Sequence, residues 1–150
     1  MKQKLACVLA LACATLALPA SAQFARPEQA VKYRQSVMSV MNTHLQRIGA
    51  MANGRVPYDA KVASEHADVI APLSRLPWQG FGPGTDKISK KAKPEVWTQQ
   101  ARFNELGEKM MGETVKLAAA AKTNNLDNLK AAFNTTAASC KACHDAYWVE

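Results

Sequence analysis

Residues 140–144 read CKACH, with two cysteines three positions apart and a histidine directly after the second. The surrounding sequence is rich in alanine and poor in β-branched and aromatic residues, which favours a helix. On a helix, Cys140, Cys143 and His144 stand at positions i, i+3 and i+4, so their side chains share one face. The fold therefore has to accommodate two thiols and an imidazole that point in nearly the same direction.

A flat macrocycle suits this arrangement, and C-x-x-C-H is the attachment signature of c-type haem. The two thiols can add across two vinyl groups, while the imidazole offers a nitrogen to the iron. The sequence therefore predicts one haem c, bound covalently through two thioethers from Cys140 and Cys143. His144 is the predicted proximal ligand of the iron.

Other uses of the motif fit less well. A redox C-x-x-C begins a helix in a βαβ setting and has a depressed thiolate pKa, whereas this motif stands late in a helical chain. A structural zinc site needs a fourth ligand and usually a second cysteine pair, and neither is apparent. A disulfide between positions i and i+3 would be strained and would leave His144 without a role.

Residues 1–22 differ from the rest of the chain. Two lysines, a short apolar run and the small residues ASA at 20–22 form the pattern of a secretory signal peptide. LAC at 11–13 also allows a lipoprotein site, although the apolar run before it is very short. The prediction is a periplasmic domain over residues 23–150, which agrees with c-type haem because bacteria attach it outside the cytoplasm.

Start and stop signals divide the remaining chain into helices. Pro27 and Asp59 suit the beginnings of two of them. Gly107 and Gly112 inside a third weaken it, and both are explained if that helix packs closely against a neighbour or a flat ligand. The expected helices span about 27–53, 59–75, 94–122 and 126 to the end, with a long loop at 76–93. This pattern predicts an all-α fold, an antiparallel four-helix bundle whose C-terminal helix attaches the haem.

Four stretches resemble the class II cytochromes c, which comprise the cytochromes c′ and their six-coordinate, low-spin relatives. They read YRQSVM at 33–38, LPWQGFGPGTD at 76–86, AKPEVW at 92–97 and AAFNTTAASCKACHDAY at 131–147. The resemblance implies that Arg34 pairs with a haem propionate, a task that suits the planar fork of a guanidinium. It also makes Gln35 a candidate for a hydrogen bond at the haem edge.

The resemblance further implies that Met38 faces the far side of the iron. A methionine thioether is a known axial ligand that raises the reduction potential of haem. The preferred interpretation is therefore an electron carrier with His144 and Met38 as axial ligands. In the alternative, Met38 is only a residue of the distal pocket, and a five-coordinate iron binds nitric oxide or carbon monoxide, as in cytochromes c′.

Trp148 departs from the family pattern, which commonly has a basic residue four positions after the haem histidine. One helical turn from His144, the indole would cover the proximal edge of the haem or pack on the end of the bundle. His44 and His66 are expected to be surface residues, and Trp78, Phe81 and Trp97 to anchor the core or the loop.

The predicted partners are redox proteins or a diatomic gas. The formal net charge of +7 is spread along the chain, and no basic stripe is interleaved with aromatics, so a nucleic-acid partner is not expected. The apolar run at the N-terminus is too short for a comfortable membrane span. We expect no enzyme, because no acid–base residue stands near Met38. A homodimer through the first helix follows from the resemblance.

Overall fold

The computed structural model describes residues 23–149. The predicted signal peptide lies outside the described residues. Within residues 23–149 no β-strand is present, and no helix combines the length and hydropathy needed to cross a membrane.

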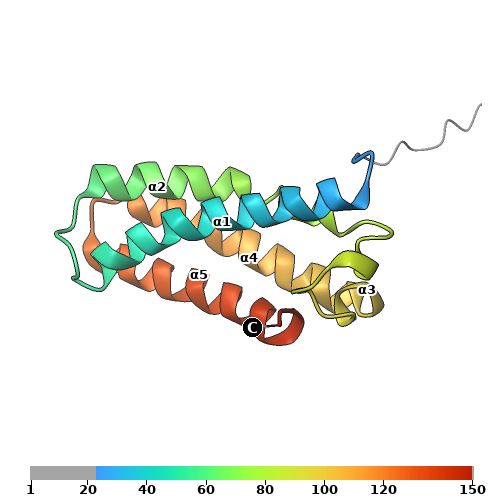
Figure 1. Ribbon diagram of the computed structural model, residues 1–150. Helices are drawn as coiled ribbons and strands as arrows, with labels where there is room; N and C mark the ends of the chain where they lie inside the picture. The colour runs from blue at the N-terminus through green and yellow to red at the C-terminus, as the bar shows by residue number, and fades with distance from the viewer. Residues whose placement is uncertain (1–22, 150) are drawn as a thin grey trace, which may run out of the picture.

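Long helices lie side by side with alternating directions, so the predicted antiparallel bundle is confirmed (Figure 1). α5 packs against α4 along the bundle and also against α1, while α2 lies against α1 and α4. The long helices are α1 (Pro27–Ala52), α2 (Ala60–Leu73), α4 (Gln100–Ala121) and α5 (Leu126–Tyr147). Short elements are η2 (Pro77–Phe81), η3 (Asp86–Ile88) and α3 (Glu95–Thr98).

Side chains at the helix starts explain two of these bounds. Asp59 accepts a hydrogen bond from the backbone N–H of Val62 at 3.0 Å and so caps α2, as predicted. Asn125 caps α5 by accepting from the N–H groups of Asp127 and Asn128. Each cap satisfies backbone donors that have no partner within the helix.

The prediction of one continuous helix over 94–122 is wrong. Gln99 has φ −119° and ψ 44°, so the chain leaves helical geometry between α3 and α4. The break allows Val96 to be buried while the indole N–H of Trp97 donates to the carbonyl of Phe81 at 3.0 Å. Tertiary contacts of these two side chains therefore override the local helical preference.

The core consists of two clusters along the bundle axis. In the larger one, each long helix contributes a side chain that is at most 1% exposed: Ile48, Ile70, Leu117 and Leu129. The smaller cluster lies where α5 ends and is centred on Val96, Phe103, Leu106 and Tyr147, with Phe81 and Trp97 packed against it. The two clusters share Trp78, which packs against both.

The predicted loop at 76–93 is anchored by aromatic residues, as expected. The indole N–H of Trp78 donates to the carbonyl of Ser74 at 2.8 Å, and its ring lies 5.5 Å from that of Phe103. Gly107 on α4 leaves the space for this ring, because a Cβ there would stand 2.8 Å from the edge of Trp78. The expected close packing thus holds at Gly107 and not at Gly112, where a Cβ would meet nothing within 4 Å.

We expect the same substitution at these two glycines of α4 to have opposite effects on stability. Gly112→Ala gains helix propensity at no steric cost and should raise the free energy of unfolding by about 0.5–1 kcal/mol. Gly107→Ala pushes a methyl group into Trp78 and should lower it by about 1–3 kcal/mol. Urea unfolding of the haem-loaded protein measures both. Equal effects at both positions would show that Trp78 does not pack as described.

Candidate functional site

Cys140 and Cys143 lie in the last turns of α5 and are both free thiols, half-buried. Cys140 packs against the larger core cluster, and Cys143 packs against the smaller one. The motif therefore stands where the two clusters meet.

Burial suppresses ionisation of both thiols. It raises the pKa of Cys140, and together with the nearby Cys140 it raises the pKa of Cys143 to about 11. Both thiols are thus protonated near neutral pH. A redox C-x-x-C requires the opposite shift, so the structure agrees with the earlier argument against that use of the motif.

His144 is exposed, whereas the two cysteines predicted to share its helix face are half-buried. The buried positions at this end of α5 include Ser139 and Tyr147, and His144 stands at the margin of the face they define. Its ring lies 5.2 Å from the ring of Trp148. Partial shielding by these neighbours lowers the pKa of His144.

Trp148 does not continue the helix as expected. α5 ends at Tyr147, and Trp148 adopts extended φ and ψ angles of −117° and 140°. It forms an isolated β-bridge with Ala92, flanked by a bond of 2.9 Å from Lys93 N–H to the Tyr147 carbonyl and one of 2.8 Å from Val149 N–H to the Lys91 carbonyl. We call this pairing of residues 91–93 with 147–149 the clasp. Trp148 is 44% exposed. Its indole therefore packs at the surface of the bundle end, beside the ring of His144.

Arg34 is the most deeply buried charged residue near the motif. Only 5% of its surface is exposed, and its guanidinium donates to the carbonyl of Gly80 and to the hydroxyl of Ser89. The guanidinium carbon lies 4.2 Å from the centre of the Phe81 ring. Burial lowers the pKa of Arg34 to about 10. No carboxylate among residues 23–149 pairs with it.

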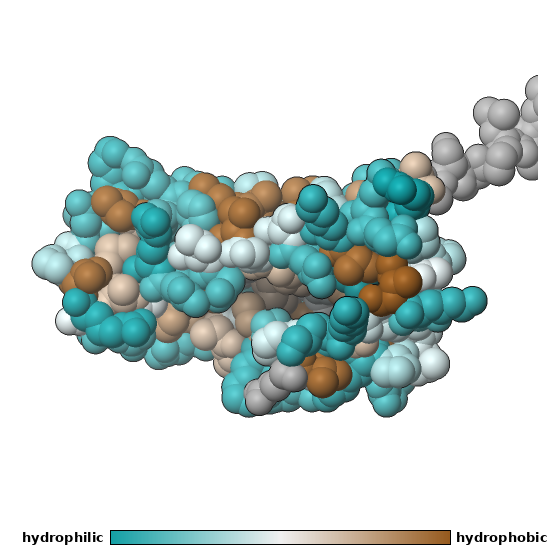
Figure 2. Space-filling view, in the orientation of Figure 1, coloured by the Kyte–Doolittle hydropathy of each residue, from teal (hydrophilic) through white to brown (hydrophobic). Residues whose placement is uncertain are grey.

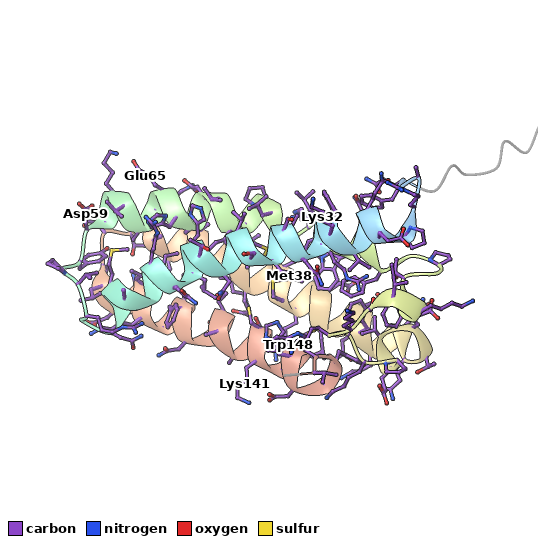
Figure 3. All side chains as sticks on the ribbon, in the orientation of Figure 1. Lys32, Met38, Asp59, Glu65, Lys141 and Trp148 are labelled. Carbon is purple, nitrogen blue, oxygen red and sulfur yellow. The ribbon has the colours of Figure 1, made fainter. Side chains whose placement is uncertain are left out.

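Met38 lies on α1, in the space between the ribbons of α1 and α5 (Figure 3). It is half-buried, whereas its neighbours Val37 and Met41 belong to the core. The surface between α1 and α5 is hollowed at its centre, with neutral and apolar residues at the bottom (Figure 2). Gln35, the other candidate on this helix, is exposed.

These residues have the chemistry that haem c requires. Two thiols and an imidazole lie on one turn of α5, a thioether lies on the facing helix α1, and a buried guanidinium without a carboxylate partner lies near the same end. A haem supplies propionates that such a cation can bind. Of the residues that the sequence assigned to the haem, all except exposed Gln35 therefore have chemistry that fits that group.

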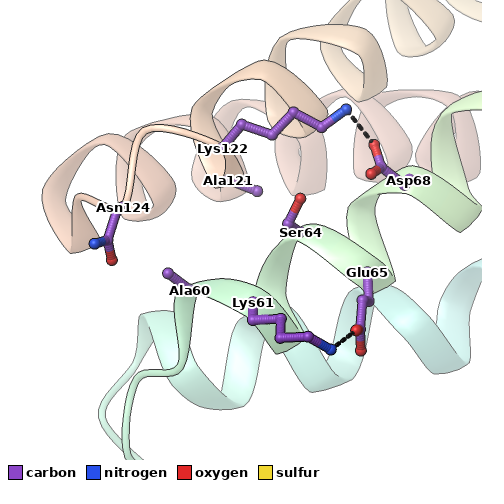
Figure 4. Close-up of a pocket in the computed structure, with 8 residues that line it drawn as sticks. All are labelled: Ala60, Lys61, Ser64, Glu65, Asp68, Ala121, Lys122 and Asn124. Atoms are coloured by element: carbon purple, nitrogen blue, oxygen red, sulfur yellow. Dashed lines mark hydrogen bonds and ion pairs between the residues drawn. The ribbon is translucent and has the colours of Figure 1, made fainter.

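A second hollow lies at the opposite end of the bundle, between α2 and the end of α4 (Figure 4). Charged side chains line it, and Lys122 pairs with Asp68 at 2.8 Å while Lys61 pairs with Glu65. All four are exposed, so this is an open charged surface.

Sequence reasoning missed one pairing. His44 and His66 were expected to be separate surface residues, but they are half-buried and in contact across α1 and α2. Residues 22 positions apart on two helices give no local signal, because only the relative rotation of the helices brings them together.

The comparisons with known proteins agree with the fold and the motif. The family model Cytochrome C′ matches residues 29–148. The chain is 47% identical to cytochrome c′ of Alcaligenes xylosoxydans xylosoxydans over 125 residues, which covers 83% of this chain and 97% of that one.

Solved structures give the same result. The crystal structure of cytochrome c′ from Rubrivivax gelatinosus superposes with a TM-score of 0.81 at 43% identity, covering 85% of this chain and 100% of that one. The nitric oxide complex of a leucine-to-alanine variant of cytochrome c prime from Alcaligenes xylosoxidans has a TM-score of 0.80 at 45% identity, covering 85% and 99%. The chain belongs to the cytochrome c′ family, and its cofactor is a covalently bound haem c.

Proposed function

We propose that this protein is a periplasmic cytochrome c′ that binds nitric oxide or carbon monoxide at a five-coordinate haem iron. The observation that carries the proposal is the likeness, over nearly all of the described chain, to cytochromes c′, one of which is solved as a nitric oxide complex. This favours the alternative given by the sequence over the His/Met electron carrier.

Cys140 and Cys143 are the proposed attachment residues, and His144 is the proposed proximal ligand. The thiols are free, share one helix face and adjoin both core clusters. The exposed position of His144 leaves its imidazole without a packing role in the core. Haem iron bound on one side by an imidazole can take a diatomic gas on the other side.

Arg34 is the proposed partner of a haem propionate. Burying a guanidinium without a counter-charge is costly, and the two neutral acceptors that it meets here offset only part of that cost. A propionate would supply the missing negative charge. Gln35 has no comparable support, because its side chain is exposed.

Met38 is proposed to restrict access to the distal side of the iron without binding it. Its unbranched side chain adapts to an irregular space and lies on the side of α1 that faces α5. A gas molecule then enters only if this side chain moves, so Met38 would tune the rate of gas binding.

The electron carrier remains a second candidate because a thioether is present on the side of α1 that faces α5. Ligation by Met38 would make the iron six-coordinate and would suit transfer to a protein partner. A homodimer through α1 is also proposed, and the exposed apolar side chain of Val40 on α1 is compatible with it.

Spin state separates the two candidates. We expect the ferric protein to be high-spin or mixed-spin by absorption and EPR spectroscopy, and Met38→Leu to leave the spin state unchanged. The reduced protein should bind carbon monoxide, and Met38→Ala should accelerate binding by opening the distal side. Met41→Leu, one turn away in the core, is the matched control and should change neither spectrum nor rate. A low-spin ferric spectrum that becomes high-spin in Met38→Leu would favour the electron carrier.

Replacing Arg34 tests the propionate contact. We expect Arg34→Gln to lower the free energy of unfolding of the haem-loaded protein by about 2–4 kcal/mol, because buried acceptors lose a charged donor. A propionate without its cation also has a raised pKa, so the pH-dependent change of the absorption spectrum should move to higher pH. Exposed Arg102, paired with Glu105 on α4, provides the control variant Arg102→Gln. If stability fell while the pH titration of the spectrum stayed unchanged, Arg34 would not contact a propionate, and its role would be limited to its hydrogen bonds with the loop at 76–93.

A further inference from the structure

His44 and His66 form a close imidazole pair on the face of the bundle made by α1 and α2. Their Nδ1 atoms are 2.9 Å apart, and their ring centres are 4.9 Å apart with the planes inclined at 71°. The two residues come from different helices, so the packing of α1 on α2 fixes their separation. They lie outside the proposed haem site, and nothing in the proposed function uses them.

Two neutral imidazoles at this distance share a single hydrogen bond, in which one Nδ1–H donates to the other Nδ1. When the donor ring carries its proton on Nε2 instead, the Nδ1 lone pairs of both rings are free. Rotation of the two rings then lets both nitrogens bind one cation in place of the hydrogen bond.

The separation of the nitrogens is compatible with a shared metal ion. Imidazole nitrogens bind first-row divalent metals at about 2.0–2.1 Å. Two such ligands of one ion are then about 2.8–3.0 Å apart at a right angle and about 3.3–3.4 Å apart in a tetrahedral site. The 2.9 Å between these Nδ1 atoms, an ordinary hydrogen-bond length, lies close to both values, so small movements of the rings would bring the nitrogens to a metal.

The surroundings of His66 favour the neutral form of its imidazole. Burial first, then His44 and Arg47, lower the pKa of His66, and the adjacent Glu65 opposes them. Glu65 is itself paired with Lys61. A hollow beside His66 is lined by Arg47 and by the carboxylate-bearing Asp59, and it leaves room for water ligands. Arg47 disfavours a bound cation, so the site should be of moderate affinity.

We propose that His44 and His66 form a binding site for a first-row divalent metal, with Cu²⁺ bound most tightly. The Irving–Williams order places Cu²⁺ first for such nitrogen ligands. Within residues 23–149 no cluster of three or more potential metal-binding side chains is present, so water completes the coordination. Because the ligands belong to two helices, the metal joins α1 to α2 and stabilises the folded state.

Equilibrium titration of the haem-loaded protein with Cu²⁺, Ni²⁺ and Zn²⁺ tests the site, with EPR of the copper form to detect nitrogen ligands. We expect one Cu²⁺ per chain, bound at least tenfold more tightly than Zn²⁺. His44→Gln and His66→Gln should each weaken Cu²⁺ binding at least tenfold. Gln46→Ala, an exposed change on the same helix, is the matched control and should leave it unchanged.

The double variant His44→Gln/His66→Gln measures Cu²⁺ binding elsewhere on the haem-loaded protein. Equal Cu²⁺ affinity in the double variant and the parent protein would overturn the proposal. So would equal affinity for Zn²⁺ and Cu²⁺, because two nitrogen ligands on one ion should follow the Irving–Williams order. Added Cu²⁺ should raise the unfolding temperature of the parent protein and of Gln46→Ala, but not that of either single histidine variant.

Discussion

The guanidinium of Arg34 connects the parts of the structure that make up the site. It lies inside the protein, donates to the backbone of Gly80 and to Ser89, and faces the ring of Phe81. These contacts fix the loop at 76–93 against α1. Gly80 is required for this approach, because a Cβ there would stand 2.7 Å from the carbonyl of Ala30 and 2.8 Å from the Cβ of Arg34. The loop in turn reaches the end of α5, which carries the haem-attachment motif.

Much of the architecture could be predicted because it depends on local signals. Apolar spacing and capping residues such as Asp59 locate the helices, and the CKACH motif identifies the cofactor. Gln99, Trp148 and the histidine pair could not be predicted in the same way. The break at Gln99 follows from the burial of Val96, and Trp148 is extended because it pairs with Ala92. The histidine pair forms because of the way α1 is rotated against α2. Each depends on a neighbour distant in sequence.

In the proposed haem site, the choice between gas binding and electron transfer depends on one side chain. The bundle, the motif and the buried cation are compatible with both proposed functions, so the fold cannot decide between them. The distance from the thioether of Met38 to the iron would decide whether the sixth position is filled or only shielded. The sequence predicts this residue as the decisive one, and the likeness to cytochromes c′ supports the proposal that it only shields the iron.

The clasp gives the site end of the bundle its own local stability. Two backbone hydrogen bonds join residues 91–93 to 147–149, and their donors are the amides of Lys93 and Val149. The clasp lies at the edge of the smaller core cluster, so it can open without separating the four helices at Ile48, Ile70, Leu117 and Leu129. Hydrogen exchange at these two amides would therefore report fraying next to His144 as an event distinct from global unfolding.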